Sequence, residues 1–165
     1  MTRRAPREGE TRLPFDPAEA KPDASLVFIG RVHSPWSDPS QMPKNPGRAR
    51  ELGQTATLEI DAAYRQGLAA LDRVSHVIVV AWLHKAERDV IVLKPSHVDA
   101  PRGAFSLRSP VRPNPIGISV ARILGIDQDA GRIAIDAIDF LDGTPLVDIK
   151  PYRPGIDAVP DAVVG

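Results

Sequence analysis

The stretch RSPVRPNPIG, residues 108–117, is the part of this sequence around which we expect the fold to be arranged. Its prolines at 110, 113 and 115 each fix φ near about −65° and bias the preceding residue toward extended backbone. The stretch can therefore be neither a helix nor a fully paired strand. We predict a stiff, ordered loop that joins two strands.

Three side chains on this loop carry hydrogen-bond donors in fixed directions: Arg108, Arg112 and Asn114. Gly117 marks a point where the backbone must turn or approach another group closely. A rigid backbone that carries such donors is typical of a binding site for a polar ligand.

Short apolar segments on both sides of the loop are predicted to be strands. These segments are residues 25–33, 55–60, 75–84, 90–93, 104–107, 118–126, 132–140 and 146–149. The run SHVIVVAWLH at 75–84 is continuously apolar and β-branched, which predicts a strand buried on both faces. Only residues 64–71 offer a plausible helix. About seven or eight short strands separated by turn signals predict a mainly β fold, a small closed or nearly closed β-barrel with one or two short helices.

The length of 165 residues indicates one domain. We expect a flexible tail over residues 1–24, the barrel domain over 25–158 and a short C-terminal tail over 159–165. The loop at about 35–54 is long for a compact domain, and Trp36 with its dense prolines favours an ordered lid over a flexible linker.

Charge and composition exclude several classes of function. Lys plus Arg equals Asp plus Glu at 21 each, so there is no bulk basic field that would attract nucleic acid. The absence of cysteine excludes disulfides and thiol nucleophiles and fits a cytoplasmic protein. No apolar run reaches the roughly eighteen residues of a membrane span.

The motifs of common cofactor and catalytic sites are also absent. No two glycines are separated by a single residue, which rules out the Gly-x-Gly turn of Rossmann nucleotide binders. The histidines at 33, 76, 84 and 97 have no metal-ligand spacing, so we expect no metal. Ser109 and Ser119 lie in no nucleophile-elbow context.

What remains is a set of polar side chains on three predicted loops. Its members are Arg108, Arg112 and Asn114, then Asp139 and Asp142, then Asp148, Lys150 and Tyr152. They could pair with one another to hold the loops together, or they could form a preorganised site. His84 could equally be a satisfied histidine at the end of a buried strand.

Three blocks of sequence resemble a known family. GAFSLRSP at 103–110, RPNPIG at 112–117 and LDGTPLVDIKPY at 141–152 are similar to the signature blocks of the TsaA-like family, typified by tRNA methyltransferase O. Supporting pieces are Ile29-Gly30, His33-Ser34-Pro35 and Ser75-His76. The resemblance covers about residues 26 to 157.

The resemblance implies a non-Rossmann barrel that binds S-adenosylmethionine (SAM) near a homodimer interface. Characterised members methylate the exocyclic nitrogen of threonylcarbamoyladenosine next to the anticodon of certain tRNAs. The resemblance would place cofactor contacts at Pro46, Gly47, His84, Lys85, Arg108, Ile118, Asp136, Ala137, Ile138 and Asp139. We expect Asp139 or Asp142 as the proton acceptor and Arg112, Asn114, Lys150 and Tyr152 on the substrate side.

Some positions depart from the family pattern. Leu107 stands where many members have threonine, Asn45 replaces a common glutamine, and Asp136 falls where a small residue is frequent. Longer members continue into a second small domain, whereas this sequence ends about a dozen residues after Tyr152. Two alternatives therefore stay open: a methyltransferase of the same fold that acts on a small molecule, and a non-catalytic SAM-binding module.

Overall fold

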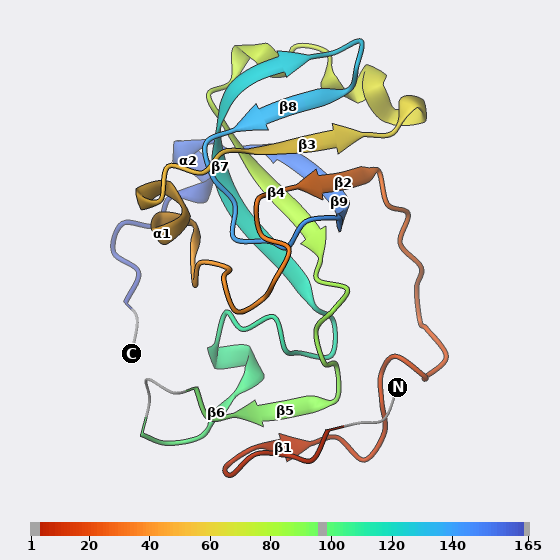
Figure 1. Ribbon diagram of the computed structural model, residues 1–165, viewed down its shortest axis with the longest axis vertical. Coiled ribbons are helices and arrows are strands. Elements are labelled where there is room, and N and C mark those ends of the chain that lie inside the picture. The colour runs from red at the N-terminus through yellow and green to blue at the C-terminus, as the bar shows by residue number, and fades with distance from the viewer. Residues whose placement is uncertain (1–3, 96–98, 164–165) are drawn as a thin grey trace. The chain divides into compact units, whose positions relative to one another are not determined.

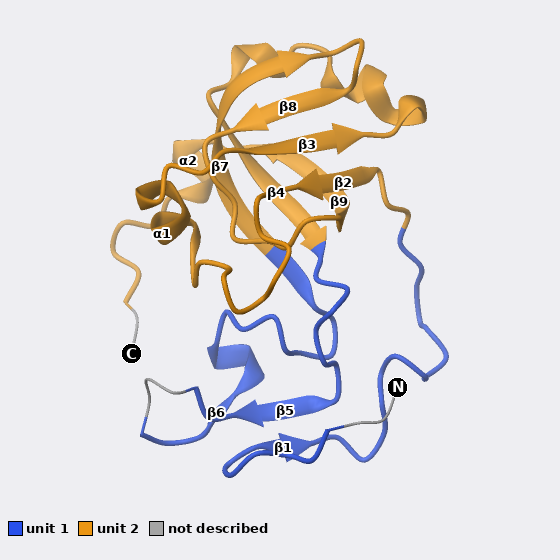
Figure 2. Ribbon diagram, in the orientation of Figure 1, with its two compact units in different colours: residues 1–26, 82–117 blue, residues 27–81, 118–165 orange. Residues whose placement is uncertain are grey.

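The computed structural model describes residues 4–95 and 99–163 (Figure 1). The chain forms two compact units (Figure 2). Unit 1 consists of residues 1–26 and 82–117, and unit 2 consists of residues 27–81 and 118–165.

Six strands close into a β-barrel in the order β2-β3-β8-β7-β4-β9 (Figure 1). Their bounds are β2 Gly30–His33, β3 Ala56–Ile60, β4 His76–Trp82, β7 Ile116–Asp127, β8 Arg132–Ile135 and β9 Thr144–Pro151. The pairings β2–β3, β2–β9, β3–β8, β4–β9 and β7–β8 are antiparallel. This arrangement confirms the prediction of a mainly β, barrel-type fold.

The core of the barrel follows from side-chain alternation along each strand. Val77, Val79 and Ala81 of β4 are fully buried, and the residues between them are only half-buried. Leu58 of β3 faces Ile133 of β8 in the ladder, and both are fully buried. Full burial of a side chain of this size contributes about 1.5–3 kcal/mol. The prediction that β4 is buried on both faces was wrong, because one of its faces remains partly accessible.

The glycine at position 30 allows β2 and β3 to approach. A Cβ at Gly30 would lie 1.9 Å from the carbonyl oxygen of Glu59. No side chain fits there without moving the strand. The close approach explains why a glycine, and not a residue with a side chain, stands at this position.

Several predicted elements differ in extent or type. β2 begins at Gly30 rather than at residue 25, because the first ladder contact is donated by the Ile29 N–H to the Leu146 carbonyl, and Leu26, Val27 and Phe28 remain exposed. Residues 104–107, predicted as a strand, begin with the 3₁₀ turn η3 Ala104–Ser106. The predicted helix consists of the 3₁₀ helices η1 Ala62–Leu68 and η2 Leu71–Arg73.

Two short α-helices complete unit 2. α1 Pro46–Glu51 lies in the long loop between β2 and β3, and α2 Pro154–Asp157 follows β9. None of the helices in the described part of the chain is long and apolar enough to cross a membrane.

Unit 1 contains a small antiparallel sheet in the order β1-β5-β6. Its strands are β1 Thr11–Arg12, β5 Val90–Leu93 and β6 Arg102–Gly103. Val90, Leu93 and Ala104 form its buried apolar cluster. The Arg12 guanidinium pairs with Asp89, whose side chain is almost fully buried. The N-terminal segment was expected to be a flexible tail, but β1 lies in that segment and adds a strand to this sheet.

A second ionic cluster fastens the same segment. Glu10 accepts hydrogen bonds from the guanidinium of Arg4 at 2.8 Å and from the backbone N–H of Arg7 at 2.9 Å. The hydrogen bond from Arg4 is the main reason that the pKa of Glu10 falls from its ordinary value of 4.5 to about 2.

This shift predicts how the stability of unit 1 depends on pH. Because the pKa of Glu10 is lower in the folded state, its stabilising contribution is complete above pH 4.5 and is lost as the pH falls toward 2. We expect Glu10→Gln to lower the free energy of unfolding at pH 6 and to have almost no effect near pH 2, measured by urea unfolding. The exposed neighbour variant Glu8→Gln is the control. A Glu10→Gln effect of equal size at both pH values would contradict the prediction.

Candidate functional site

Trp36, in the loop after β2, joins three segments of unit 2. Its indole N–H donates a buried hydrogen bond of 2.8 Å to the carbonyl of Ile138. The side chain is 9% exposed and forms an apolar cluster with Ala49 of α1 and Ala137, which follows β8. Met42 and Leu141 pack against this cluster. The structure therefore brings the Trp36 loop, α1 and the segment after β8 together, and two of these segments carry predicted cofactor residues.

Pro46 and Gly47, both predicted cofactor contacts, lie in the first turn of α1. The helix begins here because the side chain of Asn45 accepts a hydrogen bond of 2.8 Å from the backbone N–H of Arg48. Pro46 has the fixed φ that suits a first helical position. The asparagine that replaces the family's common glutamine is thus the N-cap of this helix.

Both carboxylate oxygens of Asp136 are already bonded within the protein. Oδ2 accepts from Nε of Arg50 at 2.8 Å, and Oδ1 accepts from the backbone N–H of Arg122 at 2.7 Å. Burial alone would raise the pKa of Asp136, but these hydrogen bonds outweigh it and the pKa is lowered. Asp136 is therefore ionised at neutral pH. Nothing in the sequence pattern signalled Arg50 as its partner.

Asp142 lies in the turn before β9 and contacts the start of the loop that carries Trp36. Its Oδ1 accepts from the Ser34 N–H at 3.1 Å, and its own N–H donates to the carbonyl of Trp36 at 2.8 Å. Nδ1 of His33 lies 3.6 Å from the same carboxylate oxygen. Asp139 is half-buried, and its Oδ1 is inaccessible to solvent. The two candidate proton acceptors therefore lie on one segment, next to the Trp36 cluster.

His33, which lies beside Asp142, was named from the sequence only as part of a family block. Its Nε2 lies 2.5 Å from a carboxylate oxygen of Glu59 in β3. The hydrogen bond to His33 lowers the pKa of Glu59. The His33-Ser34-Pro35 block was the available signal for this contact.

The remaining predicted residues of unit 2 lie on barrel strands or, for Tyr152, directly after β9. Ile118 is an exposed residue of β7. Lys150 of β9 forms an ion pair of 2.6 Å with Asp148, and the Tyr152 N–H donates to the carbonyl of His76 at 3.0 Å. Because Lys150 and Asp148 both lie on β9, this ion pair does not hold two loops together.

In unit 1, Arg112 braces the proline-rich loop. Its guanidinium donates to the carbonyls of Ser109 and Ala104, both at 2.9 Å, and to that of Leu107. Of the two roles considered for this side chain, binding substrate or holding the loop, the contacts in the structure are those of a brace.

Arg88 holds the other half of this loop, and sequence reasoning missed it. It donates to the carbonyl of Pro113 at 2.6 Å and to the side-chain oxygen of Asn114 at 3.3 Å. Its guanidinium carbon lies 5.2 Å from the centre of the Trp82 ring, a cation–π distance. The loop is ordered, as predicted. Two arginines hold it in place in addition to its prolines.

His84 and Lys85 lie just beyond β4, after Leu83, and Arg108 lies at the start of the braced loop. Loss of solvation lowers the pKa of His84, and the charge of Lys85 lowers it further. His84 is therefore neutral at pH 7, with one ring nitrogen able to accept a hydrogen bond. Arg108 is exposed.

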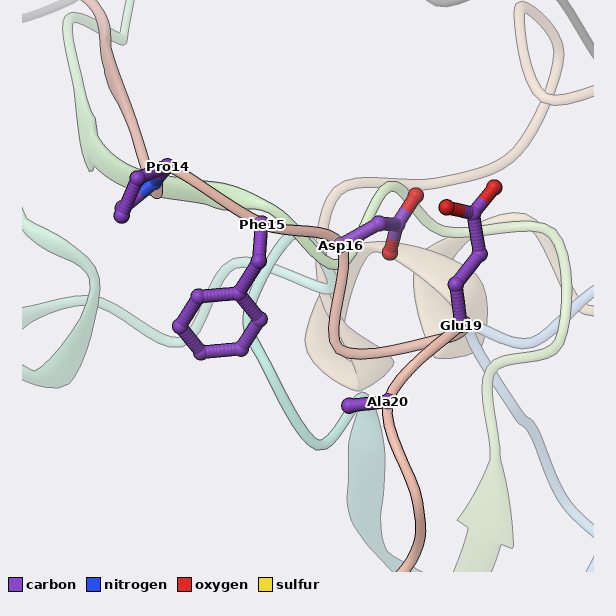
Figure 3. Close-up of a pocket in the computed structure, with 5 residues that line it drawn as sticks. All are labelled: Pro14, Phe15, Asp16, Glu19 and Ala20. Atoms are coloured by element: carbon purple, nitrogen blue, oxygen red, sulfur yellow. The ribbon is translucent and has the colours of Figure 1, made fainter.

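Other surface features do not include the predicted residues. Figure 3 shows a hollow whose lining comes from a single N-terminal stretch, with Phe15, Asp16 and Glu19 among its residues. Within residues 4–95 and 99–163, no group of three or more histidine, aspartate or glutamate side chains could hold a metal ion.

The fold defines a class: a small antiparallel β-barrel, with the blocks at 103–110 and 112–117 on a loop braced by Arg88 and Arg112. The family described as the tRNA-methyltransferase O N-terminal domain matches residues 31–158. The chain therefore belongs to this family, the TsaA-like family that the signature blocks indicate.

Individual relatives agree with this assignment. The chain is 41% identical over 131 residues to the "Probable S-adenosyl-L-methionine-binding protein VirR" of Rhizobium radiobacter, covering 79% of this chain and 72% of that protein. It is 37% identical over 134 residues to an S-adenosyl-L-methionine-binding protein of Archaeoglobus fulgidus, covering 81% of this chain and 93% of that protein.

A solved structure shares the fold. The crystal structure of TrmO from Pseudomonas aeruginosa superposes with a TM-score of 0.70 at 38% identity, covering 86% of this chain. The match spans only 61% of the Pseudomonas chain.

The bracing role of Arg112 gives a testable prediction. Arg112→Ala removes a charged donor from three carbonyls, and each hydrogen bond to a charged group contributes about 1.5–3 kcal/mol. Because water replaces part of this, we expect a loss of about 2 kcal/mol in the free energy of unfolding, measured by urea denaturation. Arg112→Lys keeps the charge without the fork and should lose an intermediate amount. Equal stability of Arg112→Ala and the wild type would show that the brace contributes nothing.

Proposed function

We propose that this protein is a SAM-dependent methyltransferase that acts on tRNA, at the exocyclic nitrogen of threonylcarbamoyladenosine next to the anticodon. The observation that carries the proposal is the match to the tRNA-methyltransferase O N-terminal domain over residues 31–158, which includes the braced loop and the Trp36 cluster. The names of two relatives as SAM-binding proteins support the cofactor.

The chemistry of the proposed residues fits this cofactor. SAM carries an adenine ring, a ribose diol, a sulfonium and an amino-acid group with both charges. Carboxylates such as Asp139 suit hydroxyl and cationic groups. Arg108 and Lys85 are cations that suit a carboxylate. We propose as cofactor contacts the residues predicted from the sequence, with Asp136 treated separately below.

When bound, SAM supplies an electrophilic methyl group for in-line displacement. The protein's task is then to align the acceptor nitrogen and to exclude water, and such alignment can lower the barrier by several kcal/mol. A carbamoylated adenine nitrogen is a weak nucleophile, so a proton acceptor is required at some stage. We propose Asp139 or Asp142, because both lie on the segment fastened by Trp36 and Ser34.

The substrate side needs a different set of groups. We propose that Lys150 and Tyr152 contribute phosphate contact and base stacking. Arg112 and Asn114 act there mainly by shaping the loop, because their side chains are bonded within unit 1. We also propose a homodimer with the cofactor near its interface, as the family resemblance implies.

The cofactor assignment predicts the effect of one substitution. Arg108→Ala should weaken or abolish SAM binding, measured by titration calorimetry, because a carboxylate of the ligand would lose its cationic partner. Arg102→Ala, another exposed arginine of unit 1, is the matched control and should bind as the wild type does. The absence of heat when SAM is added to the wild type would overturn the proposed function.

The choice of acceptor is tested separately. We expect the protein to transfer labelled methyl groups from SAM into tRNA from cells that lack it, with the label in a modified adenosine identified by nucleoside mass spectrometry. SAM binding without label in tRNA would favour one of the two alternatives, a small-molecule acceptor or a non-catalytic SAM-binding module. The zero net charge is consistent with a small-molecule acceptor.

A further inference from the structure

The bridge between Arg50 and Asp136 joins segments that are far apart in the sequence. Arg50 lies in the last turn of α1, and Asp136 follows β8 directly. Besides its bond to Asp136, Arg50 donates through Nη2 to the carbonyl of Val120 in β7 at 2.5 Å. One side chain therefore connects α1 both to a barrel strand and to the segment that carries residues 136–139.

Helix α1 needs such a connection. It has six residues, and a helix of this length is not stable by itself in water. Ala49 is its only buried residue, so its apolar attachment to Trp36 and Ala137 is small. The Arg50 contacts lie on the turn that ends the helix, and the Asn45 cap lies at its start.

Asp136 is suited to be an anchor for this contact. Its side chain is 18% exposed, and its two oxygens are occupied by Arg50 and by the backbone N–H of Arg122. The backbone N–H of Asp136 also donates to the carbonyl of Arg122 at 3.0 Å. Asp136 is thus held against β7 by hydrogen bonds that do not involve α1.

We propose that Arg50 and Asp136 are positioning residues for binding of SAM. They hold α1 in place, so that Pro46 and Gly47 have a fixed position relative to residues 137–139. This inference rests on the proposed function. It assigns the Asp136 side chain to the protein framework rather than to the direct contact that the family pattern predicted. The carboxylate acts on the ligand through α1.

The test is a double-mutant cycle read out as SAM affinity. We expect Arg50→Ala and Asp136→Ala each to weaken SAM binding by about threefold to tenfold, and the double variant to bind no more weakly than the weaker single variant. Arg48→Ala is the matched control, because Arg48 lies on the same helix and pairs with Glu51 on the exposed surface. Its SAM affinity should equal that of the wild type.

The readout separates positioning from simple stability. Affinities are measured by calorimetry well below the unfolding temperature of every variant, where a purely structural bridge would leave the Kd of the folded protein unchanged. If an alanine variant does not fold, the near-isosteric pair Arg50→Gln and Asp136→Asn replaces it in the cycle.

The outcomes are distinguishable from those for the proposed function. If the wild type does not bind SAM, the proposed function fails. If the wild type binds SAM and both single variants bind it as tightly as the wild type does, the positioning role is overturned. Additive losses in the double variant would also overturn it, because they would show that the two side chains act independently.

Discussion

The hydrogen bond from the indole of Trp36 to the carbonyl of Ile138 is the contact on which the candidate site of unit 2 depends. A buried indole N–H without a partner would cost free energy, so this bond fixes where the tryptophan can lie. Its ring then meets Ala49 and Ala137, two side chains small enough to let the surrounding backbone approach. The loop after β2, helix α1 and the segment after β8 are held together because one large side chain satisfies its polar atom on irregular backbone. The barrel supplies the rigid support, and Trp36 determines which loops share it.

Arginine side chains donate hydrogen bonds to backbone carbonyls in and near the loops. A loop rich in proline lacks N–H donors, so its carbonyls need partners from elsewhere. Arg112 and Arg88 donate to carbonyls of the 104–114 region, and Arg50 donates to the carbonyl of Val120. The guanidinium group suits this role because its donors form a planar fork. These side chains are consequently occupied within the protein. Contacts to a polyanionic partner would have to come from other cations, which agrees with a sequence whose charges balance overall.

Local pattern and distant contact explain what the sequence could and could not predict. β5 was predicted with its observed bounds, because a short apolar, β-branched run is a local signal. The start of β2 was wrong by five residues, since residues 25–29 have high β-propensity but the ladder begins only where β9 provides a partner. β1 was missed because it depends on pairing with β5 and on an ion pair between residues 77 positions apart. In the candidate site, Arg88 and Arg50 have no local pattern that reveals their partners.

The departure at Asp136 shows how such distant contacts alter the meaning of a family position. A small residue needs no partner there, whereas a half-buried carboxylate does, because an unpaired charge removed from water is strongly destabilising. Arg50, 86 positions away in the sequence, supplies that partner, and the backbone N–H of Arg122 supplies another. The roles of Arg50 and Asp136 therefore have to be interpreted together. A relative with a small residue at this position would have no carboxylate to hold an arginine of α1, so its helix would need another attachment. The geometry around Pro46 and Gly47 is for this reason expected to vary among family members together with the pair, and independently of the barrel strands.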